Sequence, residues 1–462
     1  MALLKRKEVD MLHGNLLKNI ILFSIPVMLS GILQLLFNAC DLIVVGRFAG
    51  DNALAAVGST SALTSLIVNV FIGISIGANV CVAKAIGAKD ADKAQKTVHT
   101  AILFSLIAGL FVMTVGVVGS NYFLRLLDTN LEVLDDATVY LQIYFSGAIF
   151  NLLYNYGAAI LRAKGETQKP LEYLIIAGIT NVVLNVLFVT LFKMDVDGVA
   201  LATIISQAIS AILVLRLLTK TDGYVNLNIK KLKIDGKSLK EMIYIGLPAG
   251  IQGSLFSISN VIIQKAVNSL GATAIIAGNT ACTNICGFIT TSMSSISQAC
   301  VSFSSQNCGA KNYKRCKEVL VKCIFSVIAV GVTLGSIALI FGRPLLGIYV
   351  NSEAALDEGM TKMKVVAITY CLYGVCDVLV GGMRGLGKSI VPMVISIVGI
   401  CGFRIYWVYT AFQYNHSAQV LWYSYPLSWI ITCIMNGIAY IVVFKLVMKE
   451  NKLIDSVVLD EE

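Results

Sequence analysis

Residues 20–46 read IILFSIPVMLSGILQLLFNACDLIVVG, a long apolar run that carries one proline, Pro26, and one carboxylate, Asp41. A helix needs about 20 apolar residues to cross the hydrocarbon core of a bilayer, so this run is long enough to span a membrane. Of the 462 residues in the whole chain, 57% are hydrophobic and 14% are charged. Soluble proteins carry about a quarter charged residues. The composition therefore predicts an all-α membrane protein.

Eleven further stretches share this length and apolar character. The twelve predicted spans are 15–40, 54–82, 98–120, 138–161, 171–192, 198–218, 242–264, 274–302, 319–342, 365–383, 390–412 and 419–444. The longest polar stretch between them, 219–240, is too short to form a soluble domain of its own. The sequence therefore predicts twelve transmembrane helices.

The basic residues lie mostly on one side of the predicted membrane. With the spans alternating in direction, 28 of the 36 Lys and Arg residues fall on the side of the N-terminus, seven fall on the other side, and Arg404 lies within a span. Cytoplasmic loops carry such an excess of Lys and Arg. We therefore expect both termini in the cytoplasm. The net charge of +9 is explained by this topology, and no nucleic-acid partner is expected.

The two halves of the chain match at a constant shift of 222 residues. The pairs are Pro26 with Pro248, Gly87-Ala88-Lys89 with Gly309-Ala310-Lys311, and Arg162, Gly165 and Pro170 with Arg384, Gly387 and Pro392. Each half holds six spans, an even number, so the halves are parallel repeats. The expected domains are an N-lobe at 1–218, a cytoplasmic linker at 219–241, a C-lobe at 242–445 and a cytoplasmic tail at 446–462.

Parallel repeats predict a mode of transport. Transporters built this way bind substrate between the two halves and rock the halves around that site. Pro26 and Pro248 fall early in spans 1 and 7. A proline inside a helix frees a backbone carbonyl and permits a bend, so each proline is either a hinge or a static kink.

Three ionisable side chains stand out within the apolar runs that form the spans and their ends: Asp41, Asp377 and Arg404. On insertion scales a charge at mid-bilayer costs about 2.5–3.5 kcal/mol, so each is a candidate for function. The repeat mate of Asp377 in the first half is Asn155. Asp377 and Arg404 could form a buried ion pair on adjacent helices, either structural or acting as a gate.

Polar residues at helical spacing accompany Asp41. They are Gln34 and Asn38 in span 1, Asn181 and Asn185 in span 5, and Thr203 in span 6. Carboxylate, amide and hydroxyl oxygens could ligate Na+ at Asp41, or Asp41 could carry a proton. The alternative is a polar cluster that holds helices together without a transport role.

An enzyme is not expected. Gly73-Ile74-Ser75-Ile76-Gly77 matches the nucleophile-elbow pattern G-x-S-x-G, but it lies within a span, where small residues pack helices together. The three His residues all lie near one face of the predicted membrane or the other, so the nucleophile would lack a base. No phosphate-binding loop is present, and no cofactor is predicted.

Several motifs together carry a family resemblance. They are Pro26, Asp41 with Val44-Val45-Gly46-Arg47, both Gly-Ala-Lys triplets, Leu161-Arg162-Ala163-Lys164-Gly165, and Asp377 leading into Met383-Arg384-Gly385-Leu386-Gly387. With these the whole chain resembles the MATE (multidrug and toxic compound extrusion) family, in its bacterial DinF-like and MepA-like branch.

This resemblance implies two six-helix lobes in a V and efflux driven by inward H+ or Na+. It also implies that Asp41 is the coupling carboxylate of the N-lobe, with Asn181 and Thr203 as its polar neighbours. Many relatives have Asp where this chain has Asn185, so the inferred site has one charge fewer here.

We therefore expect a cation-coupled antiporter that exports small organic compounds, cationic or amphipathic, from the cytoplasm. We expect a monomer in the bacterial cytoplasmic membrane, with a small-molecule substrate and lipid as its partners. The alternatives are a lipid-linked precursor flippase of the same superfamily and a membrane-embedded enzyme. The Tyr and Phe residues around span 4 would suit flat cations by cation–π contact, or they serve helix packing.

The charge distribution predicts which loops face the cytoplasm. In intact cells, Lys233→Cys in the linker should be protected from a membrane-impermeant thiol reagent, whereas Asp135→Cys should react with it. The unsubstituted chain corrects for labelling of its 12 native cysteines. Reaction at position 233 together with protection at position 135 would reverse the orientation.

Overall fold

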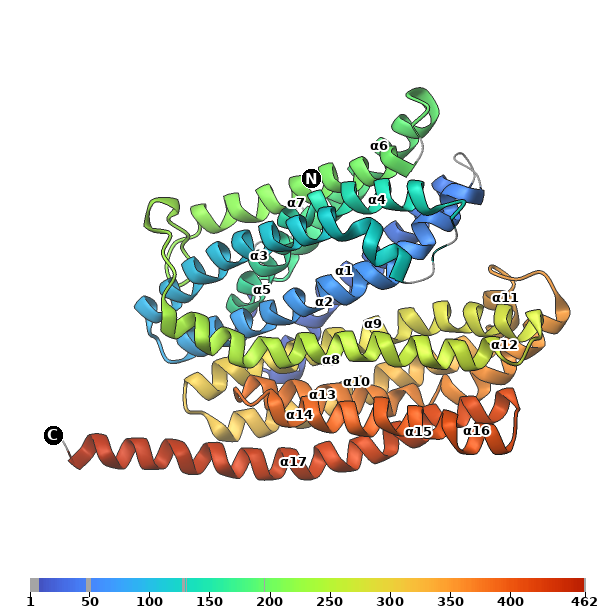
Figure 1. Ribbon diagram of the computed structural model, residues 1–462. Coiled ribbons are helices and arrows are strands. Elements are labelled where there is room, and N and C mark those ends of the chain that lie inside the picture. Colours follow the sequence, from blue (N-terminus) through green and yellow to red (C-terminus); the bar gives the residue numbers. More distant parts are fainter. Residues whose placement is uncertain (1–7, 47–50, 127–128, 130, 195, 461–462) are drawn as a thin grey trace. The chain divides into compact units, whose positions relative to one another are not determined.

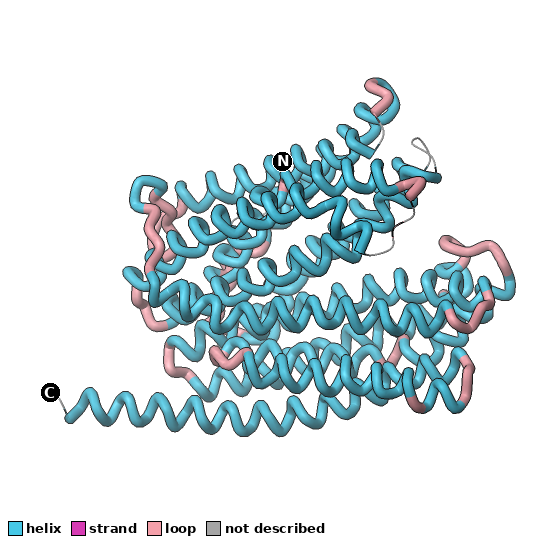
Figure 2. Tube along the Cα trace, in the orientation of Figure 1, coloured by secondary structure: helices cyan, strands magenta, loops and turns pink. Residues whose placement is uncertain are grey.

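The computed structural model describes residues 8–46, 51–126, 129, 131–194 and 196–460. Arg47, part of one motif above, lies outside these ranges. Within them the chain is helical apart from its loops and turns, and it contains no strand (Figure 1, Figure 2). A helix satisfies its own backbone N–H and C=O groups, which is why a segment in hydrocarbon adopts it.

The chain divides into two compact units, Met1–Asp10 with Ile25–Ser254 and Met11–Ser24 with Leu255–Glu462. By these bounds α1 and α8 each contribute residues to both units. The helices of the first half are α1 (Leu16–Val44), α2 (Asp51–Gly87), α3 (Ala91–Leu126), α4 (Leu134–Ser146), α5 (Ala148–Lys164), α6 (Gln168–Val186) with the π-helix η2 (Leu187–Leu191), α7 (Val196–Lys220) and the 3₁₀-helix η3 (Ile229–Lys231).

The second half begins with α8 and packs around α9, which contacts α10, α12 and α13 (Figure 1). Its helices are α8 (Gly236–Asn268), α9 (Thr273–Gly309), α10 (Tyr313–Ile340), α11 (Gly342–Leu346), α12 (Glu353–Val366), α13 (Tyr370–Gly385), α14 (Ile390–Ser396), the π-helix η4 (Ile397–Gly402), α15 (Phe403–Tyr409), α16 (Ala411–Tyr414) and α17 (Ala418–Asp460). The lobe, linker and tail boundaries given above remain predictions.

Each of the twelve predicted spans lies on helix, with short breaks at positions such as Gly147, 367–369 and Thr410. Nine helices of the described chain are long and apolar enough to cross a membrane, or ten when α12 and α13, bent by 49°, count as one span. Two of the twelve predicted spans do not meet this requirement of length and apolar character, each for a physical reason. One is divided at Gly147 into α4 and α5, and the other is α9, which is rich in Ser, Thr and Asn.

The backbone repeats with the same shift as the sequence. Lys89 and Lys311 both take a left-handed conformation, with φ of 59° and 54°, as do Gly165 and Gly387, with φ of 98° and 89°. Gly165 N–H donates to the Arg162 carbonyl at 3.0 Å. The N–H of its repeat mate, Gly387, donates to the Arg384 carbonyl at 2.8 Å. Left-handed residues of this kind end helices, so the paired motifs are paired helix ends.

Glycines bring α2 and α8 into backbone contact. A Cβ on Gly73 would lie 2.1 Å from the Gly250 nitrogen, and one on Gly77 would lie 2.1 Å from the Met242 carbonyl oxygen. Small residues four apart permit such close approach of membrane helices. Gly73–Gly77 is therefore a packing segment, as its place within a span predicts.

The segment between α7 and α8 is docked on the start of α3. Asn228 N–H donates to His99 Nε2 at 3.1 Å, and Asp235 N–H donates to Thr100 Oγ1 at 2.9 Å. Ser238 N–H donates to the Asp235 carboxylate at 2.8 Å and so holds the pKa of Asp235 below its usual range. This cap on α8 is therefore present at neutral pH and is lost as the pH falls through that lowered pKa.

The contact between α2 and α8 predicts a difference between two glycines of one helix. Gly250→Ala should destabilise the protein by about 1–3 kcal/mol, because its Cβ would overlap the Val70 carbonyl oxygen at 2.3 Å. Gly253→Ala is the matched control, since its nearest neighbour would be Asn69 Cβ at 3.8 Å. Melting temperatures in detergent measure both, and equal values would contradict the packing described.

Candidate functional site

Hydrogen bonds join Asp41, near the C-terminal end of α1, to α6 and α7. Asn185 Nδ2 donates to Asp41 Oδ1 at 2.5 Å and to Asn181 Oδ1 at 3.3 Å. Asn181 Nδ2 donates in turn to Thr203 Oγ1 at 3.4 Å. Four of the six residues predicted for cation coupling therefore form one network, called the Asp41 network below.

The partners of Asp41 in this network are neutral. Asn185 is 0% exposed and Asn181 is 5% exposed. The Asn185 Oδ1 atom is buried and accepts no hydrogen bond from the described residues. No Lys, Arg or His of the described chain lies within ion-pair distance of Asp41. A carboxylate in such surroundings is stabilised by a proton or by a bound cation.

Apolar residues surround the network. Val44, Val45 and Tyr140 belong to one buried cluster of the first unit, and Tyr144 packs against it. The rings of Tyr140 and Tyr144 stack with their centroids 6.3 Å apart. Just beyond Asn185, α6 passes into the π-helix η2. Short π segments within helices are rare, but those that occur often lie at functional sites.

Gln34 and Asn38 do not join the network. Both side chains are exposed on α1, and neither is hydrogen-bonded to Asn181, Asn185 or Thr203 in the part of the chain that the structure describes. Helical spacing puts them on the side of Asp41, but the hydrogen bonds run sideways from Asp41 to α6 rather than along α1.

Asp377 and its repeat mate Asn155 have local partners. Ser294 Oγ, on α9, donates to Asp377 Oδ2 at 3.3 Å, and Ser297 Oγ donates to the Asp377 carbonyl at 2.8 Å. Asn155 Nδ2 donates to Asn151 Oδ1 at 3.1 Å within α5. Asp377 therefore helps to join α13 to α9.

The ion pair that Asp377 and Arg404 could have formed is not present in the described chain. Arg404 turns to α17, where Nε donates to Ser428 Oγ at 3.1 Å. Its guanidinium carbon lies 4.2 Å from the ring centroid of Tyr425 and 5.6 Å from that of Trp429. Arg404 is 6% exposed, so it is a buried cation that packs on aromatic faces instead of a carboxylate.

A second buried cation is Lys362, which precedes a predicted span and has the sequence pattern of a loop residue. It lies inside α12, is 2% exposed and lines the same cavity of about 320 Å³ as Arg404. Aromatic residues at helical spacing, Tyr370 with Tyr373 and Tyr425 with Trp429, line it too. Such pairs of aromatic residues, three or four positions apart in the sequence, are the pattern that could have indicated this cavity.

Metal ligands of the usual kind are not grouped. In the described ranges, no set of three or more His, Cys, Asp or Glu side chains could hold a metal ion. A cation at Asp41 would instead meet one carboxylate together with amide and hydroxyl oxygens, which are ligands that suit hard cations.

A protein-family model described as MatE matches the chain twice, at residues 26–187 and 248–410. The two matches begin 222 residues apart, which is the shift of the internal repeat. Each half of the chain is therefore one copy of the same family unit.

Similar proteins and structures cover most of the chain. "Probable multidrug resistance protein YoeA" of Bacillus subtilis (strain 168) is 27% identical over 425 residues, which are 90% of this chain and 91% of that protein. "Multidrug export protein MepA" of Staphylococcus aureus (strain NCTC 8325 / PS 47) is 22% identical over 79% of this chain and 81% of that protein. A solved structure, "Outward-facing conformation of a multidrug resistance MATE family transporter of the MOP superfamily", has a TM-score of 0.88 at 20% identity and covers 96% of this chain and 99% of that chain. At this identity the structural likeness shows the fold.

The separate surroundings of Asp377 and Arg404 predict additive effects on stability. The free-energy changes of Asp377→Asn and Arg404→Gln should sum in the double variant to within about 0.5 kcal/mol, because the two residues are not paired and donate to or accept from different side chains, Ser294 and Ser428. Denaturation of the two single variants and the double variant in detergent measures this. A double variant that regains much of the lost stability would instead indicate an ion pair.

Proposed function

The chain belongs to the MATE family of multidrug efflux transporters, and from this premise we propose that it is a cation-coupled antiporter that exports small organic compounds from the cytoplasm. It is a multi-pass membrane protein and a transporter rather than an enzyme. The observation that carries the proposal is the Asp41 network, a carboxylate inside the membrane that is held only by neutral groups.

Asp41 supplies the coupling in this proposal. When the site faces outside, the carboxylate takes up the coupling cation, and the neutralised Asp41 is stable in its apolar surroundings. When the site faces the cytoplasm, the cation leaves and the charge returns. Pro26 and Pro248 are the proposed hinges of this cycle, because each removes one backbone hydrogen bond from a long helix. Asp377 is a candidate for a second coupling group.

The coupling ion is H+ or Na+. A proton needs only Asp41 itself. Na+ needs several oxygen ligands, and Asp41, Asn181, Asn185 and Thr203 each carry a side-chain oxygen. Purified protein in proteoliposomes separates the two, since H+ and Na+ gradients can be imposed one at a time.

We propose small organic, amphipathic compounds as the cargo. Cationic compounds were expected from the Tyr and Phe residues around span 4. Of these, Tyr140, Phe145, Tyr154 and Tyr156 are buried in helix packing, so they lend that expectation no support. The proposed location is a bacterial cytoplasmic membrane with both termini inside, and the proposed state is a monomer.

Removing the carboxylate should uncouple transport. Asp41→Asn should abolish gradient-driven export while leaving the protein folded, because an amide cannot take up and release a cation. Asp92→Asn is the control, since it makes the same change at a side chain that is 76% exposed and paired with Lys96; it should export normally. Export by Asp41→Asn at the wild-type rate and protein level would exclude the coupling role.

Asn185→Asp extends the same test to the identity of the ion. A second carboxylate beside Asp41 should favour Na+ over H+, since it adds an anionic oxygen ligand that a metal cation can share with Asp41. The measurement is the ratio of export rates under the two separately imposed gradients. A ratio that moves toward H+ would contradict this account of the site.

A further inference from the structure

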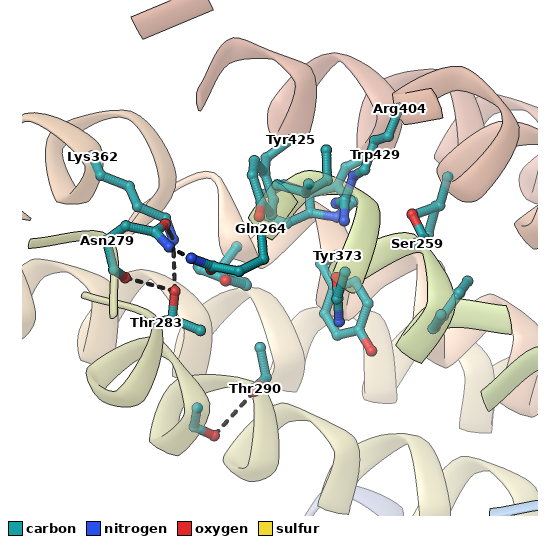
Figure 3. A pocket seen from close by; sticks show the side chains of 16 residues that line it. Ser259, Gln264, Asn279, Thr283, Thr290, Lys362, Tyr373, Arg404, Tyr425 and Trp429 are labelled. Carbon is teal, nitrogen blue, oxygen red and sulfur yellow. Dashed lines mark hydrogen bonds between the residues drawn. The ribbon is translucent and has the colours of Figure 1, made fainter. Parts of the chain in front are cut away.

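The cavity of the second unit contains two buried cations and no acidic residue. It has a volume of about 320 Å³. Lys362 enters it from α12 and Arg404 from α15 (Figure 3). Among the described residues that line the cavity, none is Asp or Glu. The site therefore carries two positive charges that the protein itself does not neutralise.

Neutral groups hold Lys362 in place. Its Nζ donates to Asn279 Oδ1 and to Thr283 Oγ1, both at 2.7 Å (Figure 3). Asn279 Nδ2 donates to Gln264 Oε1 at 3.0 Å, which turns the oxygen of Asn279 toward the lysine. An ammonium group has three protons to donate, so one remains for a ligand.

Aromatic rings connect the two cations. The Tyr425 ring centroid lies 5.6 Å from Lys362 Nζ and 4.2 Å from the Arg404 guanidinium carbon. Arg404 uses its Nε to bond Ser428 Oγ, and its two terminal amino groups donate to no acceptor in the described chain. Both residues thus keep free donors at one cavity.

Buried cations without a counter-charge need an explanation. Ring faces and amide oxygens compensate only part of the solvation that a cation loses inside a membrane protein. An anion that enters the cavity supplies the missing charge and accepts charge-assisted hydrogen bonds, which are stronger than neutral ones. A cationic compound would instead meet two like charges.

We propose that this cavity binds a small organic anion whose carboxylate or sulfonate lies between Lys362 and Arg404. The apolar body of the ligand packs on the rings of Tyr370, Tyr373 and Trp429. The volume lies within the range of about 300–1,000 Å³ found for small-molecule sites. This inference deepens the proposed function by naming the charge of a transported compound, and its test needs no ion gradient, so its failure would leave the coupling role of Asp41 intact.

Calorimetric titration of the purified chain in a neutral detergent tests the proposal. The probes are 1-naphthoate and 1-naphthylmethylammonium, which share a ring system and differ in charge, and each is also titrated into empty micelles. The naphthoate should bind at least about 10-fold more tightly. Equal affinities, or tighter binding of the ammonium, would overturn the proposal without any variant.

Variants locate the site. Lys362→Gln should weaken naphthoate binding about 10-fold or more, whereas Lys362→Arg should keep most of the affinity. Lys364→Gln is the matched control, because it removes the same charge from an exposed position of the same helix, and it should bind like the wild type. Arg404→Gln should also weaken naphthoate binding, which tests the second cation independently. Equal binding by the variants at 362 and 364 would contradict the site.

A lipid headgroup is the competing source of negative charge. Phosphatidylglycerol added to the delipidated protein should not displace naphthoate, because the cavity is proposed for a small anion. Displacement by phosphatidylglycerol that is lost in Lys362→Gln would show a lipid site and overturn the proposal.

Discussion

A charge surrounded by hydrocarbon must be neutralised by something, and this constraint explains the polar interior of the protein. Asp41 has only amides and a hydroxyl in its network, so the partner proposed for it is a mobile cation. Lys362 and Arg404 have only neutral oxygens and rings, so the partner proposed for them is a mobile anion. The two proposed sites, one in each unit, therefore carry opposite charges.

Helix packing makes such sites possible, because a charge can be held only where its neighbours are fixed. On α2 and α8 the glycines bring backbones into contact, and on α9 the Ser, Thr and Asn residues line the contact with α12 and α13. Because of its polar residues, α9 is not among the helices that are apolar enough to span a membrane. Two of these polar residues, Asn279 and Thr283, accept hydrogen bonds from Lys362. A helix that is covered by neighbouring helices can carry polar residues that would be too costly on a surface facing lipid.

The candidate sites were only partly predictable. Asn181 and Asn185 were recognisable because two amides one turn apart share a helical face, and the structure joins them to Asp41. Gln34 and Asn38 have equally regular spacing and stay outside the network, because periodicity gives a direction around the helix axis but not the position of the neighbouring helix. Lys362 is not predictable as a buried residue, because a lysine just before an apolar run has the pattern of a loop residue.

The sequence by itself determined the spans, the repeat and the family. These depend on local properties, namely the apolar run that a bilayer requires and the glycine and lysine positions that end helices in both halves. Only the tertiary structure decided which charges meet. The partner of Arg404 is Ser428 on α17 rather than Asp377 on α13, and the partners of Lys362 lie about 80 positions earlier in the chain. Such contacts depend on the rotation and bending of packed helices, which no pattern within a single span specifies.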